Sequence, residues 1–425
     1  MRKLIVVILV VVALLMLVVP RVVGGIAEQQ VGEYIAAFNA TASARGGPQI
    51  TEYSYRRGWF GAHGSQRLVL DHRVDGDPLY LVIESEVQHG PLSGGGIGLA
   101  AVHSTFSLVD ANESVKLPLS AVTRIRLDGS ASSLITGNAI DHRFATSNSK
   151  LEWGGGELQL EIGANGRRIA ADGRIDKLQF AQNDNRFTFG PMRLTGEQQQ
   201  SLHRFWLGDS NFDIAELGLV DATEGALLIE RLGFESSARL EQDRLFYSFL
   251  LKADRVATPQ LDEGRINVSV GLAGLDVVAA ARVRDKYARE TAATTALTEP
   301  DWPRIEADLL ALFADGGRLD VGRFFFGNNS GRIDASAHLE FGPTAGATML
   351  VEVLLALDAE VDIVVSKDLL AKAAESNPQL AQATAMLFAT GFLLEKGEDF
   401  VLRADYKDGL LTVNDLPFPL PLPVR

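Results

Sequence analysis

The sequence predicts an α+β protein that is mainly β. We expect an elongated, curved antiparallel sheet, helices packed on it in the C-terminal half, and one N-terminal transmembrane helix. Three observations predict this fold. Apolar and polar residues alternate from Ile50 to about Val270, helical patterns begin only near Asp276, and an uninterrupted apolar run stands at the N-terminus. Strict alternation places one face of a sheet in a core and the other in water, which is typical of antiparallel sheets.

The N-terminal run from Leu4 to Val19 contains no polar side chain. A helix needs roughly 20 apolar residues to cross a bilayer core of about 30 Å, and the sequence to Val23 supplies about that number. We therefore expect an uncleaved membrane anchor over residues 1–26. A cleaved signal peptide is the alternative, but the small residues near Ala27 form a poor cleavage site because Gly25 is the only small partner at the required spacing.

Positive charge predicts the orientation of this anchor. Arg2 and Lys3 precede the apolar run and only Arg21 follows it closely. Positively charged flanks stay in the cytoplasm. We expect a single-pass protein of a bacterial inner membrane, with its N-terminus in the cytoplasm and the bulk of the chain in the periplasm.

Four segments are expected along the chain: the anchor (1–26), an amphipathic segment and linker (27–48), one exported β-rich domain (49–414) and a Pro-rich tail (415–425). In the second segment, Glu28 to Phe38 has apolar residues on one helical face, and Ala40 to Pro48 is small and polar. No linker divides the exported domain. The tail from Leu416 to Val424 carries a proline at every second position and is expected to lie outside any sheet or helix.

The strands of the exported domain are marked by alternation and their turns by Asp, Asn and Gly. Asn165-Gly166 predicts a hairpin turn because both residues tolerate a positive φ. Arg239 to Val256 is expected to be one long strand with apolar residues spread along it. The other early strands are predicted at Arg67–Val74, Leu79–Val87, Glu157–Ile162, Arg174–Phe180 and Arg186–Phe189.

Helices are predicted late in the chain. Asp276 is an N-cap for a helix from Val277 to about Glu290, and Asp301-Trp302-Pro303 opens a helix that ends at Phe313. Ser366 caps a third helical stretch, broken at Asn377-Pro378 and resumed to about Leu394. Further strands are predicted at Arg318–Phe326, Arg332–Phe341 and Thr348–Val365, and a last hairpin at Phe400–Tyr406 and Leu410–Val413.

The composition excludes several functional classes. The chain has 425 residues, a formal net charge of −14 and no cysteine. An acidic chain does not suit general nucleic-acid binding, which needs a basic surface. The lack of cysteine excludes disulfides, thiolate metal sites and thiol catalysis.

The motifs that usually carry chemistry are weak or incomplete here, so no catalytic, cofactor-binding or metal-binding residue is predicted. The glycine-rich stretch from Gly96 to Ala101 has the spacing of a dinucleotide loop, but a strand-like segment follows it where a helix is required. Asp71, Asp75 and Asp77 miss the spacing of a calcium loop. No histidine pair has the spacing of a zinc helix, and the histidines are expected on solvated strand faces. They are His63, His72, His89, His103, His142, His203 and His338.

Several apolar runs interrupt the alternation. Burial on both faces would explain them, and so would an apolar face that binds a lipid or a partner. These runs are Leu227-Leu228-Ile229, Phe324-Phe325-Phe326, Leu354-Leu355 and Leu369-Leu370.

Four motifs, in order along nearly the whole chain, resemble landmarks of the YdgA-like family of bacterial envelope proteins. They are Tyr53 to Phe60 (YSYRRGWF), Val87 to Leu92 (VQHGPL), Gly155 to Leu160 (GGELQL) and Asp405 to Asn414 (DYKDGLLTVN). The resemblance implies an envelope location and no established catalytic residue.

The motif positions most open to a functional role are therefore Arg57, Gly58, His89, Gly90 and Pro91. From the residues themselves, Arg57-Gly58 is interpreted as a strand bend and His89-Gly90-Pro91 as a turn that ends a strand.

The leading functional hypothesis is a non-enzymatic, membrane-anchored protein that binds a lipid-like ligand or an envelope partner on its sheet. A structural or assembly protein that acts through protein contacts, for example as a homodimer, is the second hypothesis. An envelope hydrolase is the third. No cofactor and no nucleic-acid partner is expected.

Overall fold

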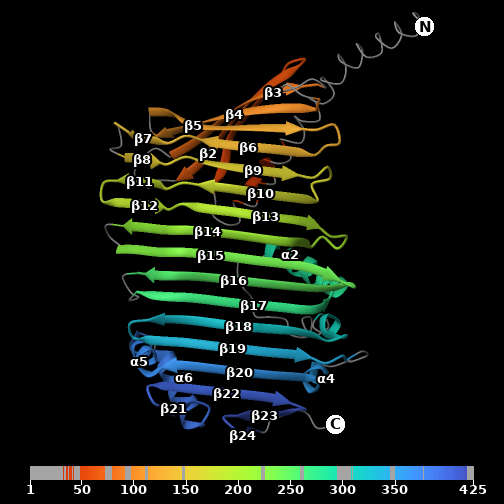
Figure 1. Ribbon diagram of the computed structural model, residues 1–425, viewed down its shortest axis with the longest axis vertical. Helices are drawn as coiled ribbons and strands as arrows, with labels where there is room; N and C mark the ends of the chain where they lie inside the picture. Colours follow the sequence, from red (N-terminus) through yellow and green to blue (C-terminus); the bar gives the residue numbers. More distant parts are fainter. Residues whose placement is uncertain are drawn as a thin grey trace, which may run out of the picture. The chain divides into compact units, whose positions relative to one another are not determined.

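The computed structural model describes residues 48–71, 79–90, 97–110, 113–145, 149–221, 225–258, 263–293, 310–344, 350–376 and 378–418, with scattered helical positions from Gly32 to Ala42 and at Asp308. The described chain is mainly β, with antiparallel strand pairing and few helices (Figure 1). It forms two compact units, Met1–Glu197 and Gln198–Arg425, and the boundary falls within β13 (Met192–Gln200).

The first unit contains one long antiparallel ladder and one short one. The long ladder runs in the order β1-β2-β3-β4-β5-β6-β9-β10, and the short one in the order β7-β8-β11-β12. Its strands are β1 Gln49–Arg57, β2 Gly61–Asp71, β3 Leu79–His89, β4 Ala100–Asp110, β5 Glu113–Ile125, β6 Ala131–Gly137, β7 Ile140–Arg143, β8 Ser149–Trp153, β9 Gly156–Ile162, β10 Arg168–Ile175, β11 Leu178–Gln182 and β12 Asn185–Phe189.

A compact core joins the two ladders of this unit. Leu108, Phe144 and Leu151 are buried in it, and Phe144 exposes only 1% of its surface. Partly buried residues from both ladders pack around them, namely Leu79, Val115, Leu117, Ile140, Leu178 and Phe180.

The helix predicted before the sheet is present at the described positions and extends to Ala42, so the expected linker begins later than Ala40. Asn39 connects this helix to β1 through two hydrogen bonds. Its Oδ1 accepts a bond from the amide of Ile50 at 2.9 Å, and its Nδ2 donates to the Ile50 carbonyl at 2.8 Å.

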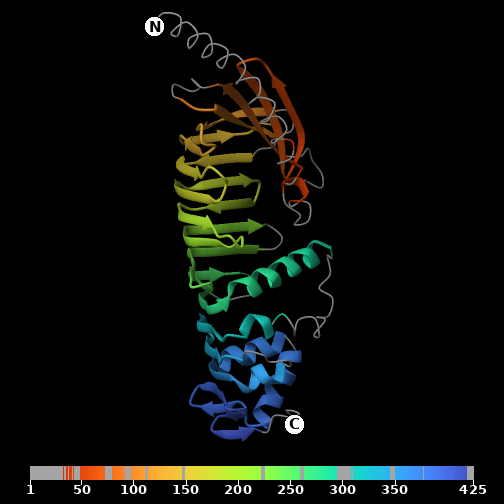
Figure 2. The ribbon, with the colours of Figure 1, turned by 90° about the vertical axis from the view of Figure 1, so that its right-hand side faces the viewer.

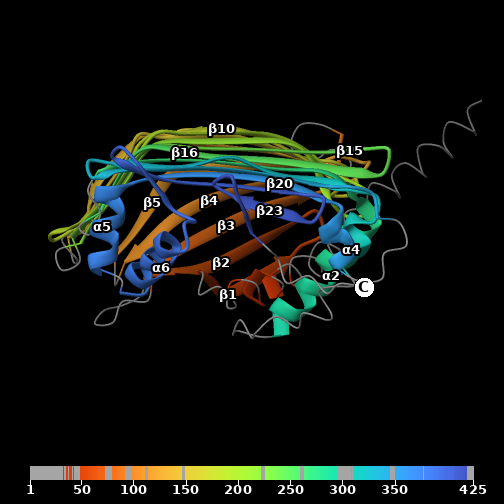
Figure 3. The same ribbon diagram turned by 90° about the horizontal axis from the view of Figure 1, so that it is seen from below.

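The second unit is an antiparallel sheet in the order β14-β15-β16-β17-β18-β19-β20-β22-β23-β24, with β21 also paired to β22. Helices α2, α4, α5 and α6 lie on one side of this sheet (Figures 2 and 3). The elements are β14 Trp206–Asp221, β15 Gly225–Glu241, β16 Arg244–Ala257, β17 Gly264–Asp276, α2 Val277–Ala293, β18 Gly317–Asn328, β19 Gly331–Phe341, α4 Leu350–Leu355, β20 Leu357–Ser366, α5 Lys367–Ser376, α6 Pro378–Ala389, β21 Leu394–Lys396, β22 Asp399–Lys407, β23 Leu410–Val413 and β24 Leu416–Phe418.

Several local predictions are confirmed. Asp276 caps α2, because its Oδ1 accepts a bond from the amide of Ala279 at 2.7 Å. Gly166 turns the β9–β10 hairpin at a φ of 66°. A strand, β4, follows the glycine-rich stretch, as the alternation there predicted. The described part of the chain has no helix with the length and hydropathy needed to cross a membrane, and the predicted anchor from Leu4 to Val19 lies outside that part.

The expected single strand from Arg239 to Val256 is wrong. The chain turns at Gln242 and Asp243, whose φ angles are 48° and 62°, and β15 and β16 pair as a hairpin. A two-residue turn of this kind usually contains Asn or Gly. Gln242-Asp243 contains neither, so the sequence did not indicate a turn here.

Two other predicted strands are wrong in part. Arg174 to Phe180 is divided at Asp176-Lys177, because β10 pairs with β9 whereas β11 pairs with β8, so the chain changes partners there. The first part of Thr348 to Val365 is the helix α4, in which Val353 is 1% exposed. Its run of apolar residues fits a buried helix turn as well as a buried strand.

The expectation that the Pro-rich tail lies outside any sheet is also wrong at its start. Leu416–Phe418 forms β24 against β23, with Pro417 opposite Thr412. Proline has no backbone N–H to donate. It is tolerated there because β24 is a short edge strand that, among the described residues, pairs with β23 alone. Residues 419–425 lie outside the described part of the chain.

Candidate functional site

Two of the sequence motifs meet at one end of β1, β2 and β3. The amide of Gly58 donates to the Gly61 carbonyl at 2.7 Å, which closes the turn between β1 and β2. The amide of His89, the last residue of β3, donates to the carbonyl of Phe60 in that turn at 2.8 Å. Arg57-Gly58 therefore begins a hairpin turn rather than bending a strand, and His89-Gly90 ends a strand as predicted. Pro91 lies outside the described residues.

Among the described histidines, His89 is the exception to the predicted solvated positions, because it is only 5% exposed, and His72 lies outside the described residues. Its Nε2 lies 3.4 Å from the hydroxyl of Tyr55, and its Nδ1 has no hydrogen-bond partner among the described residues. Burial lowers the pKa of His89, and the nearby charge of Arg57 lowers it further. The folded protein therefore favours the neutral imidazole over the charged one.

The glycines of these motifs have backbone roles. Gly90 has a φ of 118°, a conformation that side-chain-bearing residues rarely adopt, and its amide donates to the Leu99 carbonyl at 2.9 Å. A Cβ placed on Gly61 would lie 2.6 Å from the carbonyl oxygen of Val87. Strand packing and turn geometry therefore account for glycine at positions 61 and 90.

The chemistry available around His89 is limited. Among the described residues, no carboxylate hydrogen-bonds to its ring, so it lacks the orienting acid of a catalytic triad. Within the same part of the chain, no group of three His, Asp or Glu side chains is placed to hold a metal ion. His142 and His338 lie beside the carboxylates of Glu113 and Asp320 respectively, which are contacts that the sequence did not indicate.

The second unit carries a larger feature, which we call the apolar strip. Residues directly opposite each other in antiparallel strands share a face. On one face of β15–β20 and β22, the register aligns rows of apolar residues without interruption across the strands. The strip consists of Phe234, Leu251, Phe249, Val268, Val270, Phe324, Val321, Ala335, Ala337, Ile363, Val361 and Leu402.

The apolar strip is only partly covered. Phe324 exposes 44% of its surface, and its neighbours Val268, Val270 and Ile363 are half-buried. In a closed core such residues would be fully buried. The strip therefore retains contact surface that the described chain does not use.

Helices border the apolar strip at both ends of its strands. At one end Phe388 of α6 packs edge-on against Phe400 of β22, and α5 contacts β19 and β20. At the other end Phe313, just before β18, stacks on Phe341 with ring centroids 3.9 Å apart. Figure 3 shows α5 and α6 towards one end of the strands and α2 and α4 towards the other, all on one side of the sheet.

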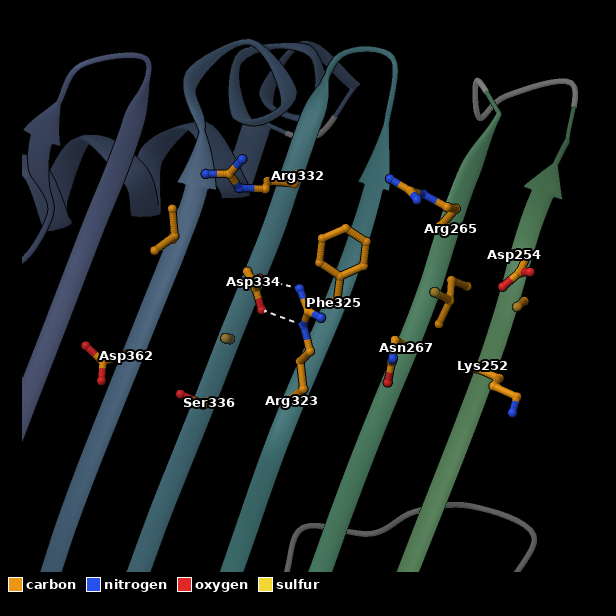
Figure 4. Close-up of a pocket in the computed structure, with 14 residues that line it drawn as sticks. Lys252, Asp254, Arg265, Asn267, Arg323, Phe325, Arg332, Asp334, Ser336 and Asp362 are labelled. Atoms are coloured by element: carbon orange, nitrogen blue, oxygen red, sulfur yellow. Dashed lines mark hydrogen bonds and ion pairs between the residues drawn. The ribbon is translucent and has the colours of Figure 1, made fainter. Parts of the chain in front are cut away.

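The opposite face of the same strands is charged. It contains a shallow hollow of about 710 Å³ lined by residues of β16–β20, with the charged side chains at alternate positions along the strands (Figure 4). Arg323 binds Asp334 through two bonds of 3.1 and 2.7 Å and lies over the Phe325 ring, 4.6 Å from its centroid. Asp362 is paired with Arg403 at 2.8 Å. Most charges in this hollow are satisfied by neighbours, which is typical of a solvated sheet face.

The apolar runs in the sequence indicated an apolar surface but did not show which residues form it. Phe324 and Phe326 lie on the strip face, whereas Phe325 lies on the charged face, so burial on both sides does not explain this run. Leu369, by contrast, is buried in α5. The alternation of β17–β20 was the available signal, because it orders the apolar residues of all four strands, but only the register shows that their faces coincide.

Comparison with known proteins identifies a family for this chain but no individual protein that matches it. No curated protein matches the chain, and no solved structure does. A family model described as "bacterial protein of unknown function (DUF945)" matches residues 1–421. Because this match spans nearly the whole sequence, the chain belongs to the DUF945 family of bacterial proteins.

Proposed function

We propose that this protein is a non-enzymatic, YdgA-like envelope protein, anchored in the inner membrane, that holds the hydrocarbon chains of a lipid on its apolar strip. The observation that carries the proposal is the half-exposed row of apolar residues across β15–β22, with Phe324 at its centre. The −14 net charge gives the chain no general attraction to anionic lipid head groups, so the contact would be made by apolar surface.

The chemistry of the strip favours hydrocarbon over a polar ligand. In its central strands the side chains are Val, Phe, Ala and Ile, which offer no hydrogen-bonding group. An extended peptide lying there would leave backbone groups without partners, at a cost of roughly 1–3 kcal/mol for each buried group. An acyl chain has no such groups, and each methylene removed from water contributes about 0.8 kcal/mol.

The expected anchor supports the same proposal. A domain tethered by residues 1–26 would work beside a bilayer, where lipid is always available. His89, the buried histidine of a sequence motif, has no carboxylate partner among the described residues, so a binding role suits this end of the sheet better than a hydrolytic one.

Adjacent phenylalanines on β18 provide a matched test. A photoreactive phenylalanine analogue replaces Phe324 on the apolar strip in one full-length variant and Phe325 on the charged face in another. After irradiation in cells, mass spectrometry identifies what each position has captured. We expect lipid at position 324 and none at position 325. Equal labelling at both positions, or none at 324, would overturn the proposal.

A protein–protein role is the second candidate, and the C-terminal edge of the sheet favours it. Leu410, Leu416 and Phe418 are exposed by 54%, 60% and 38% respectively, on or beside the short edge strand β24. Chemical crosslinking of the full-length protein in cells tests this role. Recovery of monomer alone would count against a homodimer or a stable envelope partner.

The hydrolase hypothesis is tested at His89. If the chain were a hydrolase that used this residue, His89→Gln would abolish its activity in vivo while the protein remained folded. We expect the variant to retain function.

A further inference from the structure

We infer that the apolar strip is a track along which several lipid molecules lie in series and move, rather than a site for one molecule. This inference rests on the lipid-binding function proposed above. It follows from the length of the strip, from its borders and from its uniformity.

The strip is longer than one acyl chain. From Phe234 on β15 to Leu402 on β22 it crosses six strand spacings. At about 4.8 Å each, these spacings amount to about 29 Å. The acyl chains of one bilayer leaflet extend over about half of the 30 Å core, or about 15 Å. One lipid would therefore leave about half of the strip uncovered.

The borders direct any movement across the strands. At the strand ends marked by Gly331 and Ser366, α5 packs against β19 and β20, and a Cβ on Gly331 would lie 3.4 Å from Cβ of Leu369. At the other strand ends, Phe313 stacks on Phe341 and the amide of Gly342 donates to the Ala356 carbonyl at 2.7 Å. Between these borders, the remaining direction runs from strand to strand.

The strip has no position that would hold one lipid in place. Its rows on β17, β18, β19 and β20 repeat the same apolar chemistry. A chain that shifts by one strand exchanges one set of Val, Phe and Ala contacts for another. Because the hydrophobic effect is not directional and scales with buried apolar area, neighbouring positions have similar free energies of binding, and no single position is strongly preferred.

The proposed movement of lipid along the strip can be tested by placing a charged residue in the middle of the strip. Two full-length reporter variants carry the photoreactive phenylalanine analogue at Phe234 or at Leu402, at the two ends. Val268→Glu then places a carboxylate between them on β17. The matched control is Asn267→Glu, on the same strand but on the charged face, where it faces the hollow that contains Arg265 and Arg323.

If lipid moves along the strip, both ends capture it in the parent reporters. Val268→Glu should then lower capture at one end by at least fivefold and leave the other end unchanged, whereas Asn267→Glu should change neither end. Capture at only one end of the parent, or capture at both ends that Val268→Glu does not alter, would overturn the track. Absence of lipid at every position, Phe324 included, would instead reject lipid binding itself.

Stoichiometry gives a second measurement that needs no substitution on the strip. Native mass spectrometry of the full-length protein, released from detergent after incubation with phosphatidylethanolamine and phosphatidylglycerol, should show two or more lipids bound to each chain. A limit of one lipid would overturn the track and leave single-molecule binding intact. If Val268→Glu does not fold, Val361→Glu on β20 places the charge at a second point of the strip.

Discussion

The hydroxyl of Tyr55 lies 3.4 Å from Nε2 of His89, although the two residues are 34 positions apart in the sequence. The pairing of β1 with β2 and of β2 with β3 creates this contact, because Tyr55 lies opposite Gly64 and Gly64 lies opposite Ser85 on the face that also carries His89. Two sequence motifs therefore form one partly buried polar contact at this end of the strands.

Removal of the Tyr55 hydroxyl should destabilise the first unit. Tyr55→Phe leaves Nε2 of the buried His89 without this partner, and we expect the free energy of unfolding to fall by about 0.5–1 kcal/mol, since the bond is long. Thermal unfolding of the full-length protein in detergent measures the change. Tyr80→Phe is the control, because the contact of Tyr80 with Arg67 uses its ring. Equal losses in both variants would show that the Tyr55–His89 contact contributes nothing.

The stability of the protein should fall as the pH is lowered below about 6.5. The pKa of His89 in the folded protein is below its ordinary value of 6.5 because burial and Arg57 disfavour its charged form. The unfolded chain therefore binds more protons between 6.5 and that lower pKa, so the free energy of unfolding decreases as the pH falls through this range. Above 6.5 the histidine is mainly neutral in both states and has little effect.

Denaturation of the parent and of His89→Gln at pH 7.5 and pH 5.5 checks this contribution. We expect the difference between the two pH values to be smaller in His89→Gln, which cannot take up a proton there. The same difference in both proteins would assign the pH dependence to other groups.

Two glycines on β2 should respond differently to alanine. In Gly61→Ala the new Cβ would meet the backbone carbonyl of Val87 at 2.6 Å, so strands must move apart, and we expect a loss of about 1–3 kcal/mol. In Gly64→Ala the nearest atom is a Tyr55 ring carbon at 3.7 Å, an ordinary contact. We expect this control to change the free energy of unfolding by less than about 0.5 kcal/mol. A similar cost at both positions would contradict the close approach at Gly61.

The β15–β16 turn should be sensitive to its second residue. Asp243 has a φ of 62°, which glycine adopts readily and β-branched residues resist. Asp243→Gly should leave stability unchanged or raise it by about 0.5 kcal/mol, whereas Asp243→Val should lower it by about 1–2 kcal/mol. Chemical denaturation of both variants distinguishes the two effects, and a harmless Asp243→Val would show that the turn adopts another conformation.

The sequence by itself determined the mainly β antiparallel class, most strand and helix positions after Ile50, and the cap at Asp276. These features follow from local rules. Alternation assigns a face to each residue, as it does for Phe324 and Phe325, and short polar side chains such as Asp276 satisfy the amides at a helix start.

The tertiary structure decided which residues of different strands come together. The contact of Tyr55 with His89, the division of the chain at Asp176-Lys177 and the alignment of Phe324 with Val268 and Ala335 all depend on register between strands. Register is non-local, because it is set by burial across the whole sheet rather than by neighbours in sequence. For the same reason, only the tertiary structure shows that the helices border the apolar strip and leave its centre half-exposed.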